Sequence, residues 1–431
     1  MKKSDRVAAL SFFTSLIRVL GGPITIIMVS SMLSTEEMGF YFTFFSFVVM
    51  AQLFEVGVGF VLKQYYSHDC KYDENKNLTQ MSAELCGHLL KFSIQWYACL
   101  TILYTVVLIP LGYLYYADYS GDIEWELPYI VLICCVAIRI FSNVLDSYLD
   151  GMQHQVLLNK ARLFSSLSMS VTIWICIYSG LELFSLAISQ AISVLVFISI
   201  LYTFRTKFID EIQLKLSDYS FKTQFKRIFP LLGKTSVVWF FGYFFWNGFT
   251  LLGFKLYGAE IGGLIGLSIA LAKGGYDVAN SFLMNQRTMI ANNIANNKFE
   301  QAYSIFVKYF SFSLMVLVLG YSGFFVVKSI FPSFYLFDKI LQVHDLVSIF
   351  GFYLMILYMT GVNNFVRAYK IEPFIYMSIY NALSVCLAFY ITPILDVEGL
   401  FYLSLLALAP SLVYSTFIYS NKVTQSKKAI V

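Results

Sequence analysis

The chain has 431 residues, of which 58% are hydrophobic and only 13% are charged. The mean hydropathy of +0.69 lies far above the range of soluble proteins and excludes a water-soluble enzyme or binding domain. The formal net charge of +4 is small and gives no reason to expect nucleic acid as a partner.

Apolar runs long enough to form transmembrane helices recur along the whole chain. Such a helix needs roughly 20 apolar residues, and short polar breaks such as Gly121-Asp122 and Ser179-Gly180 separate the runs. The pattern predicts an all-α integral membrane protein with about twelve transmembrane helices. The expected spans are 7–33, 39–62, 89–116, 128–149, 163–180, 182–204, 235–257, 261–284, 304–328, 344–366, 372–392 and 399–419.

The loops between these spans differ in charge. With the N-terminus in the cytoplasm, almost all Lys and Arg outside the spans fall on the cytoplasmic side, whereas loop 117–127 on the other side is acidic. Cytoplasmic loops of membrane proteins carry an excess of Lys and Arg. We therefore expect both termini to be cytoplasmic.

The longest polar interruption divides the chain near its middle. We expect a six-helix lobe over 1–204, a basic amphipathic cytoplasmic linker over 205–234, a second six-helix lobe over 235–419 and a cytoplasmic tail over 420–431. A shift of 222 residues places Glu55 on Asp277 and aligns the second span with the eighth. This alignment suggests that the two lobes are repeats, an arrangement common in transporters.

Five charged residues lie inside the predicted spans: Arg18, Glu55, Arg139, Lys273 and Asp277. A charge near the middle of a membrane helix costs at least about 2.5 to 3.5 kcal/mol, and such residues normally face a bundle interior or an aqueous cavity. At about 1.5 Å per residue, the three cations lie roughly 15 to 17 Å from the cytoplasmic ends of their spans. These residues are our first candidates for a functional site.

Polar residues at helical spacing extend these positions into stripes. Arg139 shares a helix face with Asn143, Asp146 and Asp150, and Lys273 and Asp277 share one with Asn280. Tyr243 and Asn247 form a further stripe, flanked by Trp246. The complete set of candidate cavity residues is therefore Arg18, Arg139 and Lys273 as cations, Glu55, Asp277 and Asp146 as acids, and Asn143, Asn247, Tyr243, Trp246 and Asn280 as polar or aromatic residues.

Three cations near the midplane favour an anionic ligand. Guanidinium groups suit phosphate oxygens through paired, charge-assisted hydrogen bonds. The alternative is that each cation only neutralises a neighbouring acid, Arg18 with Glu55 and Lys273 with Asp277. No catalytic arrangement and no metal-ligand spacing of Cys or His accompanies these charges, so we expect neither catalysis nor a metal or other cofactor.

The first helical hairpin resembles that of a known family. Arg18 is followed by Leu33–Tyr41, LSTEEMGFY, and by Phe54–Phe60, FEVGVGF, which place a short acidic turn before a second helix that bears a carboxylate. With the six-plus-six plan, the chain resembles over its full length the Wzx-type polysaccharide repeat-unit flippases of the multidrug/oligosaccharidyl-lipid/polysaccharide (MOP) exporter superfamily. It is more distantly similar to lipid II flippases, in which basic residues on helices one and eight face the cavity, where Arg18 and Lys273 stand here.

This resemblance implies a function and partners. It implies V-shaped lobes that work by alternating access in the bacterial cytoplasmic (inner) membrane. The implied substrate is an undecaprenyl-diphosphate-linked oligosaccharide, as in O-antigen and lipopolysaccharide synthesis. Membrane lipids surround such a protein, and a polysaccharide polymerase and glycosyltransferases of the same pathway are its expected neighbours. Since both lobes lie in one chain, we expect a monomer.

Transport needs a driving force. Moving negative charge out of a cell with a negative interior is favourable by about 2.3 kcal/mol per unit charge and 100 mV. The membrane potential could therefore drive a diphosphate outward, and a proton or sodium ion at Glu55 or Asp277 could reset the empty carrier.

Two other functions fit parts of the sequence. A drug or cation exporter of the same superfamily would favour a net acidic cavity, in contrast to the cations found here. A membrane polysaccharide polymerase would carry catalytic groups on a long outer loop, and the predicted outer loops are only about 5 to 15 residues long.

Overall fold

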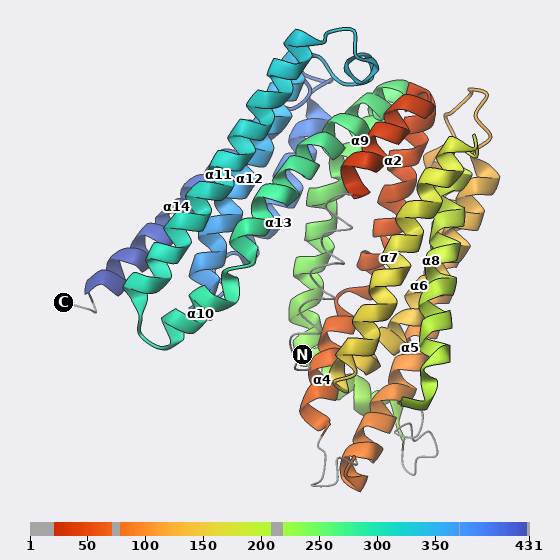
Figure 1. Cartoon of the computed structure of the whole chain (residues 1–431), viewed down its shortest axis with the longest axis vertical. Coiled ribbons are helices and arrows are strands. Elements are labelled where there is room, and N and C mark those ends of the chain that lie inside the picture. The colour runs from red at the N-terminus through yellow and green to blue at the C-terminus, as the bar shows by residue number, and fades with distance from the viewer. Residues whose placement is uncertain (1–20, 71–77, 208–218, 370, 429–431) are drawn as a thin grey trace. The chain divides into compact units, whose positions relative to one another are not determined.

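The computed structural model describes residues 21–70, 78–207, 219–369 and 371–428 (Figure 1). Nearly all of these residues are helical, and the chain divides into two compact units. Unit 1 comprises the described residues up to Leu33 together with Thr43–Tyr243, and unit 2 comprises Ser34–Phe42 and the described residues from Phe244 onward. Helices α2 and α9 therefore each contribute residues to both units.

Unit 1 is organised around α6. Its helices are Gly21–Met32, the last part of α2 (Thr35–Val49), then α3 (Ala51–Glu55), α4 (Val58–Asp69), α5 (Gln80–Tyr115), α6 (Glu126–Gly151), α7 (Gln155–Tyr178), α8 (Phe184–Thr203) and the first part of α9 (Phe221–Met284). Helix α6 packs against α4, α5 and α8, and α7 packs along α8. Helix α6 thus has neighbouring helices from several parts of the unit.

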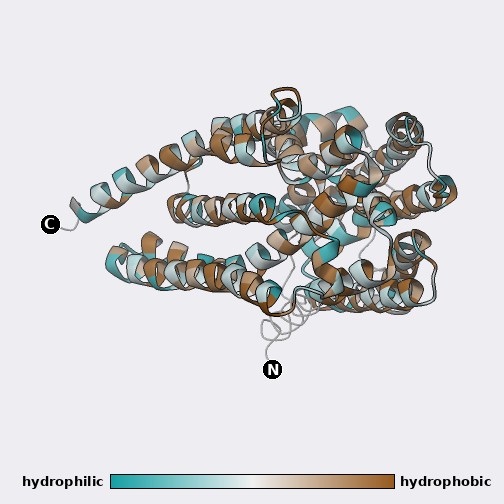
Figure 2. Ribbon diagram, turned by 90° about the horizontal axis from the view of Figure 1, so that it is seen from above, coloured by the Kyte–Doolittle hydropathy of each residue, from teal (hydrophilic) through white to brown (hydrophobic). Residues whose placement is uncertain are grey.

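Unit 2 contains the second part of α9 and the helices that follow it. These are α10 (Arg287–Ala295), α11 (Phe299–Ile330), α12 (Val343–Arg367), α13 (Ile375–Ile391) and α14 (Tyr402–Lys428). Helix α14 packs on α12 and α13, and α10 packs on α11. Apolar residues cover long stretches of the helices in both units (Figure 2).

The predicted all-α membrane architecture is confirmed. Nine helices among the described residues are long and apolar enough to cross a membrane, and Gly21–Met32 and Ile375–Ile391 are shorter apolar helices. One of the nine, Trp239–Ile294, covers most of the predicted span 235–257 and all of 261–284. The two spans meet at Gly258, where φ is 82° and ψ is 177°, a conformation that interrupts the helix and that glycine adopts without strain.

The second predicted span, 39–62, is interrupted. Val56 and Gly57 are both left-handed, with φ of 43° and 79°, so that α3 ends at Glu55 and α4 begins at Val58. The Val56 carbonyl oxygen accepts a hydrogen bond from the Ser236 hydroxyl of α9 at 3.3 Å. The chain therefore breaks directly beside one of the candidate acids.

Part of the segment expected as a cytoplasmic linker, 205–234, is helical. After a short 3₁₀ turn at Arg205–Lys207, the described chain resumes at residue 219 and enters α9 at Phe221. Phe221 stacks on Phe92 of α5 with ring centroids 4.9 Å apart. Arg227 binds Asp69 of α4 at 2.7 Å. The start of α9 is thus held against unit 1 by side-chain contacts.

The start of α2 packs closely against the second part of α9 within unit 2. The Ser34 and Glu37 side chains bond to each other's backbone N–H groups, a capping box that begins α2. A methyl group on Gly39 would overlap the Ala259 carbonyl oxygen, and one on Gly263 would overlap the Thr35 carbonyl oxygen. In these reciprocal contacts Gly39 corresponds to Gly263 and Thr35 to Ala259. Each corresponding pair is 224 positions apart, whereas the sequence alignment gave 222.

Candidate functional site

Glu55 lies at the end of α3 among polar side chains of unit 1. Its carboxylate accepts a hydrogen bond from the Tyr97 hydroxyl of α5 at 2.5 Å and one from the Asn143 amide of α6 at 3.4 Å. A methyl group on Gly59 would stand 2.5 Å from the same carboxylate. Glycine at 59 thus leaves the space that Glu55 occupies beside the break in the helix.

A second polar group lies further along α6. Asp146 receives two hydrogen bonds from Arg162 of α7, at 3.0 and 2.7 Å, and an ion pair from Lys63 of α4 at 3.0 Å. Asp150 lies 3.4 Å from each of these two cations. The Asp146 side chain is 11% exposed and the two cations about a third. Two acids and two cations thus form a balanced ionic cluster.

Arg139 is placed differently. Its guanidinium carbon lies 4.4 Å from the ring centre of Phe197 on α8, and one of its nitrogens donates to the Ser142 hydroxyl at 3.3 Å. Its described partners are thus a ring and a hydroxyl. A guanidinium group has five N–H donors, and one nitrogen of Arg139 has a hydrogen-bond partner among the described residues.

The candidates of unit 2 lie mainly on α9. Lys273 and Asp277 form an ion pair at 2.8 Å, one turn apart on the helix, and their side chains are 44% and 50% exposed. This pair agrees with the alternative considered above, in which Lys273 only neutralises the charge of Asp277. The amide oxygen of Asn280 is buried and has no hydrogen-bond partner among the described residues.

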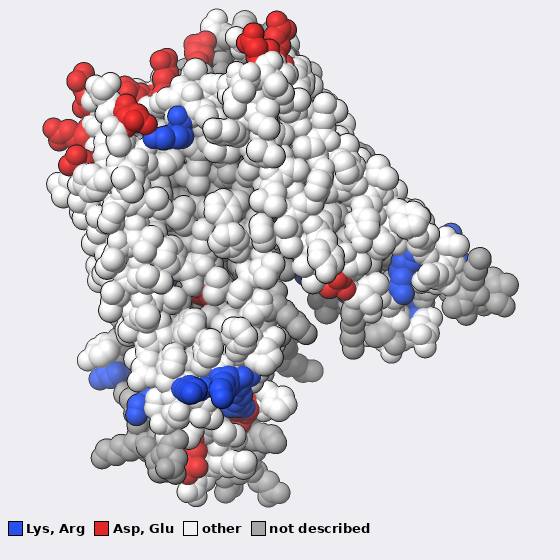
Figure 3. Space-filling view, turned by 180° about the vertical axis from the view of Figure 1, so that it is seen from behind, with Lys and Arg blue, Asp and Glu red and all other residues white. Residues whose placement is uncertain are grey.

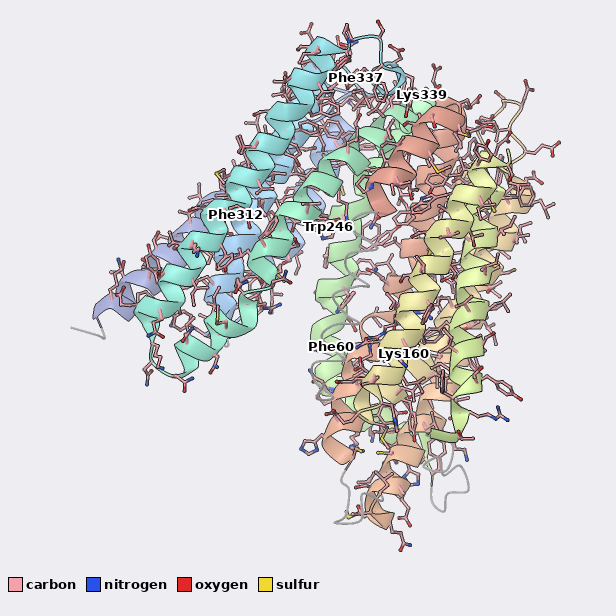
Figure 4. All side chains as sticks on the ribbon, viewed as in Figure 1. Phe60, Lys160, Trp246, Phe312, Phe337 and Lys339 are labelled. Carbon is pink, nitrogen blue, oxygen red and sulfur yellow. The ribbon has the colours of Figure 1, made fainter. Side chains whose placement is uncertain are left out.

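The aromatic candidates belong to different units. The Tyr243 hydroxyl donates to the Ser46 carbonyl oxygen in unit 1 at 3.0 Å. Trp246 lies in unit 2, with its ring centre 5.7 Å from that of Tyr276 (Figure 4). Asn247 follows on α9 and is half-buried. The stripe predicted on this helix therefore spans the boundary between the units.

That the three predicted cations lie together in one cavity remains a prediction. Arg18 lies outside the described residues, Arg139 belongs to unit 1, and Lys273 belongs to unit 2. The predicted α6 stripe does bring its polar residues onto partners inside unit 1, where Asn143 reaches Glu55 and Asp146 reaches Arg162.

Sequence reasoning missed three members of this site. Tyr97 has only the small hydroxyl residues Ser93 and Thr101 at helical spacing on either side, and these did not mark it as part of a polar stripe. Lys63 and Arg162 were assigned to cytoplasmic loops because the spans were expected to end at 62 and to begin at 163. The structure instead starts α7 at Gln155 and continues α4 to Asp69. Residues 155 to 162 contain no helix breaker, and this could have indicated that the helix begins before Arg162.

Glu55 and Asp277 do not follow the register found at the contact between α2 and α9. The register of 224 at the contact between α2 and α9 differs by two residues from the alignment that paired them. Two residues turn an α-helix by about 200°, which points a side chain to nearly the opposite face. Their surroundings agree with this difference, because Glu55 is held by Tyr97 whereas Asp277 is half-exposed and bound to Lys273.

No known protein family and no curated protein matches the sequence of the chain. Its structure does resemble solved structures. The inward-facing conformation of a multidrug resistance MATE family transporter of the MOP superfamily matches with a TM-score of 0.69 over 99% of both chains, at 14% identity. The chain has the fold of these transporters.

Two further structures have the same fold. The outward-facing conformation of a multidrug resistance MATE family transporter matches with a TM-score of 0.61 and 14% identity. The match includes 98% of this chain and 96% of the transporter. A MOP superfamily transporter from Pyrococcus furiosus matches with a TM-score of 0.53 and 13% identity. The match includes 98% of this chain and 95% of that transporter, whose binding pocket is described as having reverse polarity.

Proposed function

We propose that the chain is a transporter of the MOP superfamily and works by alternating access. The observation that carries this proposal is the fold, which matches an inward-facing transporter over 99% of both chains and an outward-facing one nearly as completely. Charged and polar side chains on otherwise apolar helices support it, because residues of this kind mark substrate and ion pathways in membrane proteins.

The proposed substrate is an undecaprenyl-diphosphate-linked oligosaccharide, flipped outward across a bacterial inner membrane with both termini cytoplasmic. Arg139 supports an anionic substrate, because a hydroxyl and an aromatic ring leave N–H donors for phosphate oxygens. Arg18 and Lys273 would complete the cationic layer. In transport, Lys273 would exchange Asp277 for the substrate's diphosphate.

Complementation of a bacterial strain that lacks its repeat-unit flippase tests this substrate. At matched membrane abundance, we expect the wild type to restore surface polysaccharide and Arg139→Ala to restore little. Arg139→Lys should restore an intermediate amount, because it keeps the charge without the paired donors. Lys160→Ala is the control, since Lys160 is an exposed cation elsewhere in unit 1 (Figure 4). Normal polysaccharide with Arg139→Ala would contradict the cationic site.

Drug or cation export is a second candidate. The solved structures named above include multidrug resistance transporters. The ion pairs also favour it, because Lys273 with Asp277 and the ionic cluster around Asp146 carry no excess positive charge. Expression in a drug-sensitive strain separates the two functions. Increased drug resistance without restored polysaccharide would support the exporter.

We further propose that Glu55 is the coupling residue that exchanges a proton or cation. It lies half-buried beside the break at Val56 and Gly57, where a change in its charge could act on the helix. Asp277 is a weaker candidate, since Lys273 already balances its charge. We expect Glu55→Gln to keep the fold, lose most transport and abolish the pH dependence of transport, whereas Asp277→Asn keeps that dependence. Unchanged pH dependence in Glu55→Gln would refute the coupling role.

A further inference from the structure

Tyr97 differs from the other buried tyrosine on the same face of α5. Its hydroxyl donates to the Glu55 carboxylate at 2.5 Å. Tyr104, about two turns further along the helix, is equally buried, but its hydroxyl donates to the backbone carbonyl oxygen of Phe47 at 3.1 Å. Tyr97 therefore bonds to a group that can gain and lose a proton, whereas Tyr104 bonds to a group that cannot.

The Tyr97 hydroxyl is itself held by a second hydroxyl. Ser147 of α6 is buried and forms a hydrogen bond with Tyr97. A phenol has one proton to donate, and Tyr97 gives it to Glu55, so Ser147 is the donor in this second bond. The chain from Ser147 to Tyr97 to Glu55 thus has one direction, and hydrogen bonds in such chains strengthen one another.

Gly59 lies where this chain meets α4. A methyl group there would stand 2.5 Å from a Glu55 oxygen and 3.0 Å from the Tyr97 oxygen, and the Ser147 oxygen lies 3.4 Å from the same point. The Gly59 backbone N–H also donates to Glu55. Because α4 begins at Val58, this N–H belongs to the first turn, where helices lack internal acceptors. Glu55 therefore also caps the helix that follows the break.

The remaining groups that face Glu55 come from α4 and α6. Asn143 donates to the carboxylate at 3.4 Å, a longer bond than that of Tyr97. The charged residues among the described groups that act on Glu55 are Lys63, Asp146 and Arg139. Lys63 and Asp146 are paired at 3.0 Å, so their effects on the Glu55 charge oppose each other. Tyr97 thus makes the shortest side-chain bond to a carboxylate whose nearby charges partly cancel.

We propose that Tyr97, held by Ser147, sets the pH at which Glu55 takes up its proton. The inference rests on the proposed coupling role of Glu55. A hydroxyl donor stabilises the charged carboxylate more than the neutral acid. Glu55 is half-buried, so water can deliver the proton to a carboxylate oxygen while Tyr97 keeps its own proton. Tyr97 is therefore a positioning residue for the coupling step.

Infrared spectroscopy of the full chain in lipid bilayers tests the proposal without a substrate. The carbonyl stretch of a protonated carboxylic acid is followed during a pH titration, and the band that is missing in Glu55→Gln belongs to Glu55. We expect Tyr97→Phe to move the midpoint of this band to higher pH by about 1 to 2 pH units, the effect of one hydrogen bond lost by a charged group.

A second variant and a matched control accompany Tyr97→Phe. Ser147→Ala should move the midpoint in the same direction by less, because Tyr97 keeps its bond to the carboxylate, and it tests the proposal even if Tyr97→Phe does not fold. Tyr104→Phe removes a buried hydroxyl of the same helix that bonds elsewhere, and it should leave the midpoint unchanged. A midpoint that none of these variants moves, or that Tyr97→Phe and Tyr104→Phe move equally, would overturn the inference while leaving the coupling role of Glu55.

The same titration tests the coupling role separately. If no band were lost in Glu55→Gln, Glu55 would not titrate, and its role as a proton-coupling residue would fail together with the inference. Sodium in place of choline, at constant ionic strength, should leave the midpoint unchanged. A midpoint that falls with sodium would show that a cation occupies the carboxylate, which would overturn the inference and keep Glu55 as a cation-coupling residue.

Discussion

The four residues of the predicted α6 stripe, Arg139, Asn143, Asp146 and Asp150, each contact another helix of unit 1. Arg139 reaches α8, Asn143 reaches α3, and Asp146 and Asp150 reach α4 and α7. A buried ion pair adds little net stability compared with apolar packing, but removing one member leaves an uncompensated charge. These residues therefore determine which helices pack against α6, and they add little to the free energy of that packing.

Asp146→Asn should destabilise unit 1. The substitution leaves Arg162 and Lys63 with Asp150 as their nearest acid, at 3.4 Å from each. We expect a loss of about 2 to 4 kcal/mol, reduced from the fully buried case because both cations are partly exposed. Thermal unfolding in detergent measures it. Asp150→Asn is the matched control and should lower the melting temperature less, and equal effects would contradict the central role of Asp146.

At the scale of helices, the contact between the start of α2 and α9 depends on glycine. Gly39 and Gly263 bring the two backbones close enough that each faces a carbonyl oxygen of the other helix. Small residues at such crossings are typical of membrane helices, because close approach gains packing where the hydrophobic effect is absent. The capping box at Ser34 fixes where α2 begins and so sets this register.

Gly39→Ala should weaken this crossing. The added methyl group would overlap the Ala259 carbonyl oxygen, and we expect a loss of about 1 to 3 kcal/mol, typical of overpacking. Gly320→Ala on α11 is the control. Nothing lies within 4 Å of a methyl group there, and alanine favours a helix by up to about 1 kcal/mol. If both variants melted at the same temperature, the close contact would not exist.

The sequence supported prediction of the helices better than of the site. Span limits follow from apolar length, so that 344–366 agrees with α12 at Val343–Arg367. The break at Val56 was not foreseen, because valine gives no signal for a left-handed residue. Tyr97 and Glu55 are 42 positions apart, and only the packing of α5 on α3 brings them together. Local patterns show which residues are unusual, whereas contacts between helices decide their partners.

At the scale of the molecule, charge separates the two ends of unit 1. Acidic side chains gather at one end, and Lys and Arg near the other (Figure 3). Because cytoplasmic loops are rich in Lys and Arg, the α5–α6 loop should face outward and the α10–α11 connection inward.

Labelling with a membrane-impermeant maleimide tests this orientation. In a chain whose seven cysteines are replaced by serine, we expect Asp122→Cys to react in cells with a permeable outer envelope. Lys298→Cys should react only after the cytoplasmic membrane is opened. Labelling of both before that step would contradict the orientation.

The units do not coincide with the halves of the sequence. Ser34–Phe42 comes from the first half but belongs to unit 2, and Phe221–Tyr243 comes from the second half but belongs to unit 1. If the gene were cut after Lys207, each fragment would carry a segment that the other needs. Neither fragment should fold completely when made alone, and the two should assemble when made together.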